Sequence, residues 1–157
     1  MTGTRGPDST PRKQRVGAYA LCQDTRGPGR GASGSAPLLL CRMSARTRTP
    51  GRWTLPGGGV RHGEDPAKAV LREMAEETGL SGQVHRVLGV HSNVYDSDGT
   101  SIHGVRLLYL VEITGGSPRR ERDDTTDDLG WFGPTELDRL DLSAHAAYGI
   151  GLLRHER

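Results

Sequence analysis

The hydrophobic positions of the chain fall into short runs that are separated by polar stretches rich in glycine and aspartate. Apolar runs of this length, bounded by turn-forming residues, are typical of strands. The turn sequence Asp-Ser-Asp-Gly at 96–99 joins the two longest runs into a hairpin. The predicted strands are Val16–Cys22, Ala36–Arg42, Arg52–Pro56, Gln83–Tyr95, Ile102–Ile113 and Leu129–Phe132.

Helical signals occur in three segments, and the clearest is Pro66–Thr78. Asp65 precedes it as an N-cap, Pro66 suits the first helical position, and Gly79 suits the left-handed residue that follows a helix. Strands and helices are mixed without strict alternation, which favours an α/β fold with a mixed sheet and helices on its faces. The two further predicted helices are Pro134–Leu140 and Ser143–Glu156.

Length and composition indicate one domain with a modest core, since the chain has 157 residues and a mass of 16.9 kDa. Residues 1–15 are polar, basic and rich in glycine and proline, so we expect a disordered tail before a single domain at 16–157. The stretch Gln23–Ser35 is predicted to be a long flexible connection. It lacks the Gly-Lys-Ser/Thr ending of a phosphate-binding loop.

Charge and cysteine content limit the classes of partner and the cellular location that we expect. A formal charge of +2 is too near neutrality to indicate a nucleic-acid polymer or a membrane surface. No run approaches the roughly 18 apolar residues of a membrane span. Cys22 and Cys41 form no CxxC pair, and no apolar signal segment is visible, so we expect a reduced, cytoplasmic protein.

Acidic residues cluster on the predicted helix Pro66–Thr78. Because Glu73, Glu76 and Glu77 are three and four positions apart, they share an arc of roughly 100° on the helix surface. Glu64 adds a carboxylate just before the helix. We expect this face to be open and the opposite face to pack on the sheet through Ala67, Leu71, Met74, Ala75 and Thr78.

A cation is needed to offset the repulsion between these clustered carboxylates. Like charges at these spacings each cost a few tenths of a kcal/mol on an isolated helix. Arg72 stands four residues before Glu76 and can neutralise part of the charge, but one guanidinium cannot balance four carboxylates. Mg²⁺ prefers oxygen ligands and also takes substrate phosphate oxygens, so it is the cation we expect. A solvated charged face is the alternative.

The order of these residues decides between the two interpretations. Gly58 is followed after five residues by Glu64, and after seven more by Arg-Glu-Met-Ala-Glu-Glu-Thr-Gly-Leu at 72–80. This arrangement resembles, without departure, the box of the Nudix hydrolase family, and the flanking strands are similar as well. The resemblance implies an α/β/α sandwich that hydrolyses a nucleoside diphosphate linked to another moiety. It also implies Mg²⁺ as cofactor, with Mn²⁺ as a substitute, and a small-molecule nucleotide as substrate.

The resemblance assigns roles to the residues of the box. Glu73 is expected to be the base or a metal ligand, and Glu76 and Glu77 to be metal ligands. The backbone carbonyl of Gly58 would be a further ligand. The remaining two residues, Arg72 and Glu64, are expected to orient the cluster by ion pairing.

Members of the family often take one more acidic ligand or base from a later loop. We prefer Glu121 as this ligand, with Asp127 beside it; a solvated loop acid is the alternative for each. The other candidates are Asp123, Asp124 and Asp128. Arg61 stands where many members have an acid, and it is expected either to contact a substrate phosphate or to be exposed.

Substrate choice is open at this level. Tyr95 resembles the downstream tyrosine of dinucleoside polyphosphate hydrolases at an imperfect offset, while Arg106 and Trp131 are further candidates for substrate binding. The leading hypothesis is cleavage of nucleoside triphosphates, oxidised ones included. The alternatives are nucleotide sugars, dinucleoside polyphosphates and a catalytically silent nucleotide-sensing module. Family members are often homodimers, an option that the sequence leaves open.

Overall fold

The computed structural model describes residues 9–25, 36–121 and 124–156. Its strands form a four-stranded sheet, with the order β4–β1–β6–β5, and a three-stranded sheet, with the order β3–β2–β7. The strands are β1 (Arg12–Cys22), β2 (Leu38–Met43), β3 (Trp53–Thr54), β4 (Gly57–Gly59), β5 (Leu80–Ser97), β6 (Thr100–Gly116) and β7 (Thr126–Phe132). The helices are α1 (Pro66–Thr78), α2 (Pro134–Leu137) and α3 (Ala144–His155).

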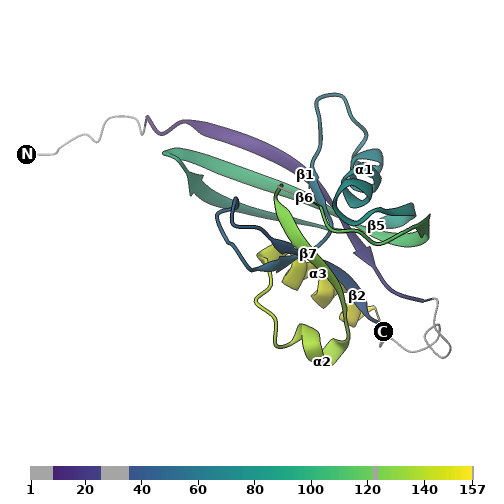
Figure 1. Ribbon diagram of the computed structural model, residues 1–157. Coiled ribbons are helices and arrows are strands. Elements are labelled where there is room, and N and C mark those ends of the chain that lie inside the picture. Colours follow the sequence, from purple (N-terminus) through teal and green to yellow (C-terminus); the bar gives the residue numbers. More distant parts are fainter. Residues whose placement is uncertain (1–8, 26–35, 122–123, 157) are drawn as a thin grey trace, which may run out of the picture.

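The helices lie on opposite sides of the strands (Figure 1). Helix α1 packs on one face of the four-stranded sheet, whereas α3 packs on the other side against β5 and β3. The first strand pairs parallel with β6 and antiparallel with β4, so the sheet is mixed. The expected α/β/α sandwich with a mixed sheet is confirmed.

Both faces of the central strands are buried, which explains their nearly continuous apolar sequence. In β1, Ala18 and Ala20 belong to the core cluster beneath α1, whereas Leu21 belongs to the cluster beneath α3. Each cluster takes further residues from the three-stranded sheet. The two clusters therefore hold the helices to the sheets and fix where α1 lies.

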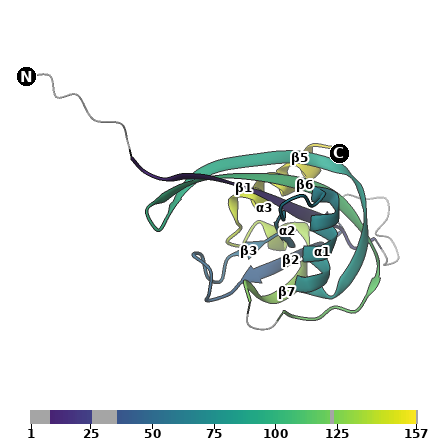
Figure 2. The same ribbon diagram turned by 90° about the horizontal axis from the view of Figure 1, so that it is seen from above.

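The hairpin β5–β6 is longer than the sequence indicated. Asp98 and Gly99 both adopt positive φ, 49° and 74°, which is the conformation that a tight hairpin turn requires. Register shifts occur near Gly82, Arg86 and Gly89. Such irregularities increase the bend of a strand, and the hairpin curves around the rest of the molecule (Figure 2). Its distal half becomes the wall of a cleft.

Two expectations about the strands are corrected. Strand β1 begins at Arg12, so residues 12–15 are not part of a disordered tail; their backbone pairs with Ser101–Gly104 of β6 although their side chains are exposed. Residues 1–8, and 26–35 within the predicted connection, lie outside the described residues. The strand Gly57–Gly59 was not predicted, because glycine has low strand propensity.

The short helix α2 ends at Leu137, three residues before its predicted end. Helix α3 begins after Ser143, whose hydroxyl accepts a hydrogen bond from the Ala146 N–H. Within the part of the chain that the structure describes, no helix is long and apolar enough to cross a membrane.

Candidate active site

Helix α1 has the ends that its sequence predicts. The Asp65 side chain accepts a hydrogen bond from the Ala67 N–H at 2.8 Å, and Gly79 closes the helix with a φ of 73°. These caps satisfy backbone groups that would otherwise lack partners. The helix lies against β4, so that its acidic residues meet the glycine strand.

Glu77 is buried, which corrects the expected orientation of the helix. Its side of α1 also includes Ala69, Val70, Met74 and Thr78, and Glu77 itself is only 5% exposed. The Gly57 N–H donates a hydrogen bond to Glu77 Oε2 at 3.1 Å. Because β4 approaches α1 at this point, the carboxylate faces a backbone donor instead of solvent.

Gly58 and Glu73 are in close contact. A β-carbon on Gly58 would lie 2.6 Å from the Glu73 carboxyl carbon, so only glycine leaves room for that carboxylate. The Gly58 backbone thus lies beside Glu73. This contact was not visible in the sequence, because β4 was not predicted as a strand.

Arg72 holds the exposed part of the cluster together. Its guanidinium donates to Glu64 at 2.7 Å, to Glu73 at 2.8 Å and to Glu76 at 3.4 Å, and also to the Gly59 carbonyl at 3.1 Å. These partners raise the pKa of Arg72, and its hydrogen bonds are the main reason that the pKa of Glu64 falls to about 2. The predicted ion pairing of Arg72 and Glu64 is confirmed.

In the buried part of the cluster, neighbouring carboxylates repel the charge of Glu77. Burial raises the pKa of Glu77 well above its usual range, and the charges of Glu73, Glu121 and Asp124 raise it further, against the lowering effect of the Gly57 N–H. No arginine donates to Glu77 within the described residues. A cation at this point would relieve both the desolvation and the repulsion.

Of the later acids, Glu121 and Asp124 are the two whose charges act on Glu77. Burial and Asp124 raise the pKa of Glu121, the Glu73 charge raises it as well, and the Thr126 hydroxyl donates to Glu121 at 3.2 Å. Asp127 instead pairs with Arg42 at 2.8 Å. Asp123 lies outside the described residues. Asp128 pairs with Arg120 at 2.8 Å.

The donor set suits a hard divalent cation. It consists of carboxylate oxygens and the glycine backbone, and it includes no thiolate or imidazole. Mg²⁺ and Mn²⁺ accept oxygen ligands of this kind. Among the described residues no three acidic, histidine or cysteine side chains already stand at metal-binding spacing. Three of the carboxylates, Glu64, Glu73 and Glu76, instead accept hydrogen bonds from the Arg72 guanidinium.

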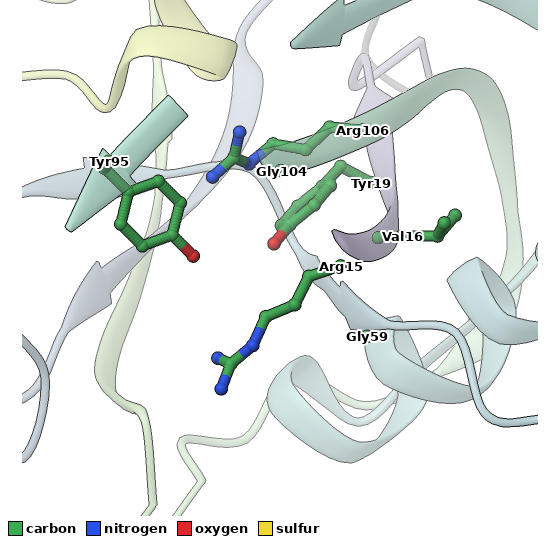
Figure 3. Close-up of a pocket in the computed structure, with 8 residues that line it drawn as sticks. Arg15, Val16, Tyr19, Gly59, Tyr95, Gly104 and Arg106 are labelled. Atoms are coloured by element: carbon green, nitrogen blue, oxygen red, sulfur yellow. The ribbon is translucent and has the colours of Figure 1, made fainter. Parts of the chain in front are cut away.

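A cleft opens beside this site, and two of the four predicted substrate residues line it. Tyr95 and Arg106 project toward it from the hairpin, together with Tyr19 and Arg15 from β1 (Figure 3). Arg61 instead extends over α1, with its guanidinium 3.8 Å from Glu76 and its side chain 68% exposed. Trp131 packs against the core cluster beneath α1.

The neighbours of Tyr95 and Arg106 in this cleft were not predicted from the sequence. Asn93 stands two residues before Tyr95 and accepts a hydrogen bond from Arg106. The period of two along a strand would have placed Asn93 on the same face as Tyr95. Nothing in the sequence placed Arg15 or Arg48 there, because they come from distant segments.

The model of the NUDIX domain matches residues 12–150. The chain belongs to the NUDIX family. The crystal structure of a MutT NUDIX hydrolase from Burkholderia pseudomallei is 30% identical to it, with a TM-score of 0.68 over 88% of this chain and 97% of that one. The NUDIX domain of Shewanella oneidensis NrtR, crystallised with ADP-ribose, has a TM-score of 0.72 at 20% identity over 91% and 88% of the two chains. That second likeness concerns the fold.

A curated relative from Homo sapiens, diphosphoinositol polyphosphate phosphohydrolase 3-alpha, is 44% identical over 71 residues, or 45% of this chain. A protein from Mycobacterium tuberculosis named MutT4 is 31% identical over 109 residues, or 68% of this chain. The matches span 43% and 44% of the lengths of these two NUDIX relatives. Their similarity is therefore that of a shared domain.

Proposed function

We propose that this NUDIX protein hydrolyses a phosphoanhydride bond in a small-molecule nucleotide or related diphosphate, with Mg²⁺ as its cofactor and Mn²⁺ as a substitute. The observation that supports this most is that Glu73 and Glu77 lie against the Gly57–Gly59 strand, where the charge of Glu121 also acts on Glu77. Without a cation the carboxylates of such a site repel one another. The site suits a cation that also binds phosphate oxygens. Because Cys22 and Cys41 are buried free thiols, we place the reaction in the reducing cytoplasm.

The ligands in this proposal are Glu73, Glu76, Glu77, Glu121 and the Gly58 carbonyl. When bound, the cation screens the phosphate oxygens, lowers the pKa of a water and stabilises the leaving phosphate. In this proposal Glu73 takes the proton of the attacking water or acts as a ligand, while Arg72 binds one of its oxygens. The hydrogen bond from Arg72 to Glu76 must break before Glu76 can coordinate the cation.

Burial gives Glu77 a separate role. It is held by the Gly57 N–H on the protein side of the site, where its charge is least screened by water. Because burial raises the pKa of Glu77, protons compete with a cation for this carboxylate more strongly than they would at an exposed glutamate. Binding should therefore strengthen as the pH rises.

The test is a panel of substrates with and without metal. The protein should hydrolyse at least one of a deoxynucleoside triphosphate, ADP-ribose, a nucleotide sugar and diadenosine tetraphosphate in Mg²⁺, and excess EDTA should stop the reaction. Product analysis would distinguish triphosphate cleavage from the alternatives. Binding of nucleotide and Mg²⁺ without any turnover would contradict the proposal and favour the nucleotide-sensing module.

A further inference from the structure

Arg106 is a half-buried arginine whose charge is not balanced by an acid in the described part of the chain. It lines both cavities of the cleft, which measure about 350 Å³ and 160 Å³. The other arginines that line these cavities differ from it. Arg15 and Arg48 are exposed to solvent, and Arg52 pairs with Asp141 at 3.2 Å. A charge that is partly withdrawn from water and lacks a counter-ion attracts an anion.

Two residues hold the Arg106 guanidinium against the sheet. Asn93 of β5 and Gly104 of β6 stand directly opposite each other in the hairpin. Arg106 Nη1 donates a hydrogen bond to the side-chain oxygen of Asn93. A β-carbon on Gly104 would lie 2.9 Å from the same Nη1 and 3.1 Å from the guanidinium carbon. Only glycine leaves this space to the guanidinium.

Asn93 occupies the place in which a carboxylate would be the stronger partner. Hydrogen bonds from arginine to aspartate or glutamate are stronger than those to a neutral acceptor, because both groups are charged. The amide oxygen of Asn93 fixes the guanidinium and leaves its positive charge available to a ligand. This arrangement differs from a structural ion pair such as that of Arg42 with Asp127, in which the charges offset each other.

The fixed guanidinium is close to the carboxylate site. The smaller cavity is lined both by Arg106 and by Gly59 of β4, with Tyr19 as a further lining residue (Figure 3). Burial raises the pKa of Tyr19, an effect that the Arg106 guanidinium opposes. The charges of Glu77 and Glu73 raise the same pKa. One tyrosine thus interacts with both groups, which places them within reach of one small anion.

We propose that Arg106 binds a phosphoryl group of the substrate, and that Asn93 and Gly104 are the positioning residues that hold its guanidinium for this contact. The inference rests on the proposed hydrolase function and adds the residues that bind the substrate anion beside the cation. The forked donors of a guanidinium match two oxygens of a phosphoryl group. These oxygens are charged both before and during the reaction, so the contact should mainly lower KM.

Asn93→Asp tests the role of the neutral partner. The variant retains the shape and the acceptor, but it adds a charge that neutralises Arg106. In Mg²⁺, with the compound of the substrate panel that is hydrolysed fastest, KM should rise about tenfold and kcat should stay within threefold of the wild-type value. The melting temperature in EDTA should be unchanged or higher, because an ion pair replaces a neutral hydrogen bond. A wild-type KM would overturn the proposal, since aspartate satisfies a merely structural hydrogen bond.

A matched pair of glycine variants on β6 tests the position of the guanidinium. In Gly104→Ala the new methyl would lie 2.9 Å from Arg106 Nη1 and must move the guanidinium, whereas in Gly115→Ala it meets nothing within 4 Å. KM should rise about tenfold in Gly104→Ala and less than twofold in Gly115→Ala. Equal KM values in the two variants would contradict the positioning role of Gly104.

A binding measurement does not depend on turnover. Calorimetry with inorganic pyrophosphate in EDTA should show binding that weakens as salt is added. Asn93→Asp and Arg106→Gln should each weaken this binding at least tenfold. Arg86→Gln is the control, because that exposed arginine pairs with Glu156 away from the cleft, and its affinity should stay within twofold of the wild-type value.

The two measurements together separate this proposal from the hydrolase function. Pyrophosphate binding that depends on Arg106, in a protein that hydrolyses no compound of the panel, would refute the proposed function and support the anion site. Hydrolysis with a KM and a pyrophosphate affinity that do not depend on Arg106 would refute the anion site and support the function.

Discussion

Glu77 has a charge that its surroundings oppose. It lies on the packed side of α1, where it accepts a hydrogen bond from the Gly57 N–H, and burial raises its pKa. Structural positions of this kind are usually apolar, since an unpaired buried carboxylate costs several kcal/mol. The cation of the proposed function would account for this charge, because it would offset both the burial and the repulsion.

Replacing Glu77 by glutamine should therefore separate activity from stability. The amide oxygen can still accept the hydrogen bond from Gly57, while the buried charge is removed. We expect Glu77→Gln to lower kcat at least a hundredfold and to leave the melting temperature in EDTA unchanged or higher. Melting curves with and without Mg²⁺ provide the check, because the stabilisation by Mg²⁺ should also shrink. Normal turnover at limiting Mg²⁺ would rule out this role.

At the scale of elements, the pairing of α1 with the glycine strand β4 creates the site. Gly58 and Gly59 of β4 both have an ordinary extended backbone conformation. What matters is the distance between the two elements, because Glu73 fills the space above Gly58. The two neighbouring glycines thus differ only in what a side chain would meet.

This difference gives a matched pair of variants. In Gly58→Ala the new methyl would lie 2.6 Å from the Glu73 carboxyl carbon and must displace that carboxylate, whereas in Gly59→Ala it meets nothing within 4 Å. We expect kcat to fall about tenfold to a hundredfold in Gly58→Ala and less than threefold in Gly59→Ala. Steady-state kinetics at saturating Mg²⁺ would measure both. Equal effects would show that Glu73 is not positioned by Gly58.

The N-cap of α1 gives an element-scale prediction about stability. Asp65 accepts from the Ala67 N–H, and loss of such a cap costs about 1 kcal/mol. Asp65→Ala should lower the free energy of unfolding by that amount in urea titrations, while Asp65→Asn should retain most of it. A neutral Asp65→Ala would mean that packing alone holds the first turn.

On the scale of the whole molecule, His145 links the layers. Its ring packs against Tyr19 of β1 at a centroid distance of 4.3 Å, and its Nε2 lies 2.9 Å from the Thr54 hydroxyl of β3. It belongs to the first turn of α3. One buried imidazole therefore contacts both sheets and the helix layer, and its protonation affects all three.

The pH dependence of stability follows from this position. Burial lowers the pKa of His145 from 6.5 to about 3 in the folded protein, so that between these values the unfolded chain binds a proton and the native protein does not. The stabilisation from neutral His145 is complete above pH 6.5 and is lost as the pH falls toward 3. Its slope is at most about 1.4 kcal/mol per pH unit.

Urea denaturation between pH 7.5 and pH 4.5 would measure this effect. His145→Gln should flatten the profile in that range, whereas His85→Gln, at an exposed histidine beside Glu112, should leave it as in the wild type. An unchanged profile in His145→Gln would assign the acid sensitivity to other groups.

The sequence by itself determined the family, the boundaries of α1 and the ion pairing of Arg72 with Glu64. All three depend on local signals: capping residues, and spacings within one helical segment and the loop before it. It also placed Tyr95 and Arg106 on strands of one hairpin, although it could not show what they face.

Only the tertiary structure decided that Glu77 is buried, that Gly57–Gly59 is a strand, and that Arg15 and Arg48 lie in one cleft with Arg106. Each of these facts depends on which distant segments become neighbours. Gly57–Gly59 is extended because it pairs with β1, and Glu77 is buried because that strand then lies against α1. Long-range pairing leaves no signal at a fixed spacing, so the shape of the cleft and its charge appear only after the chain has folded.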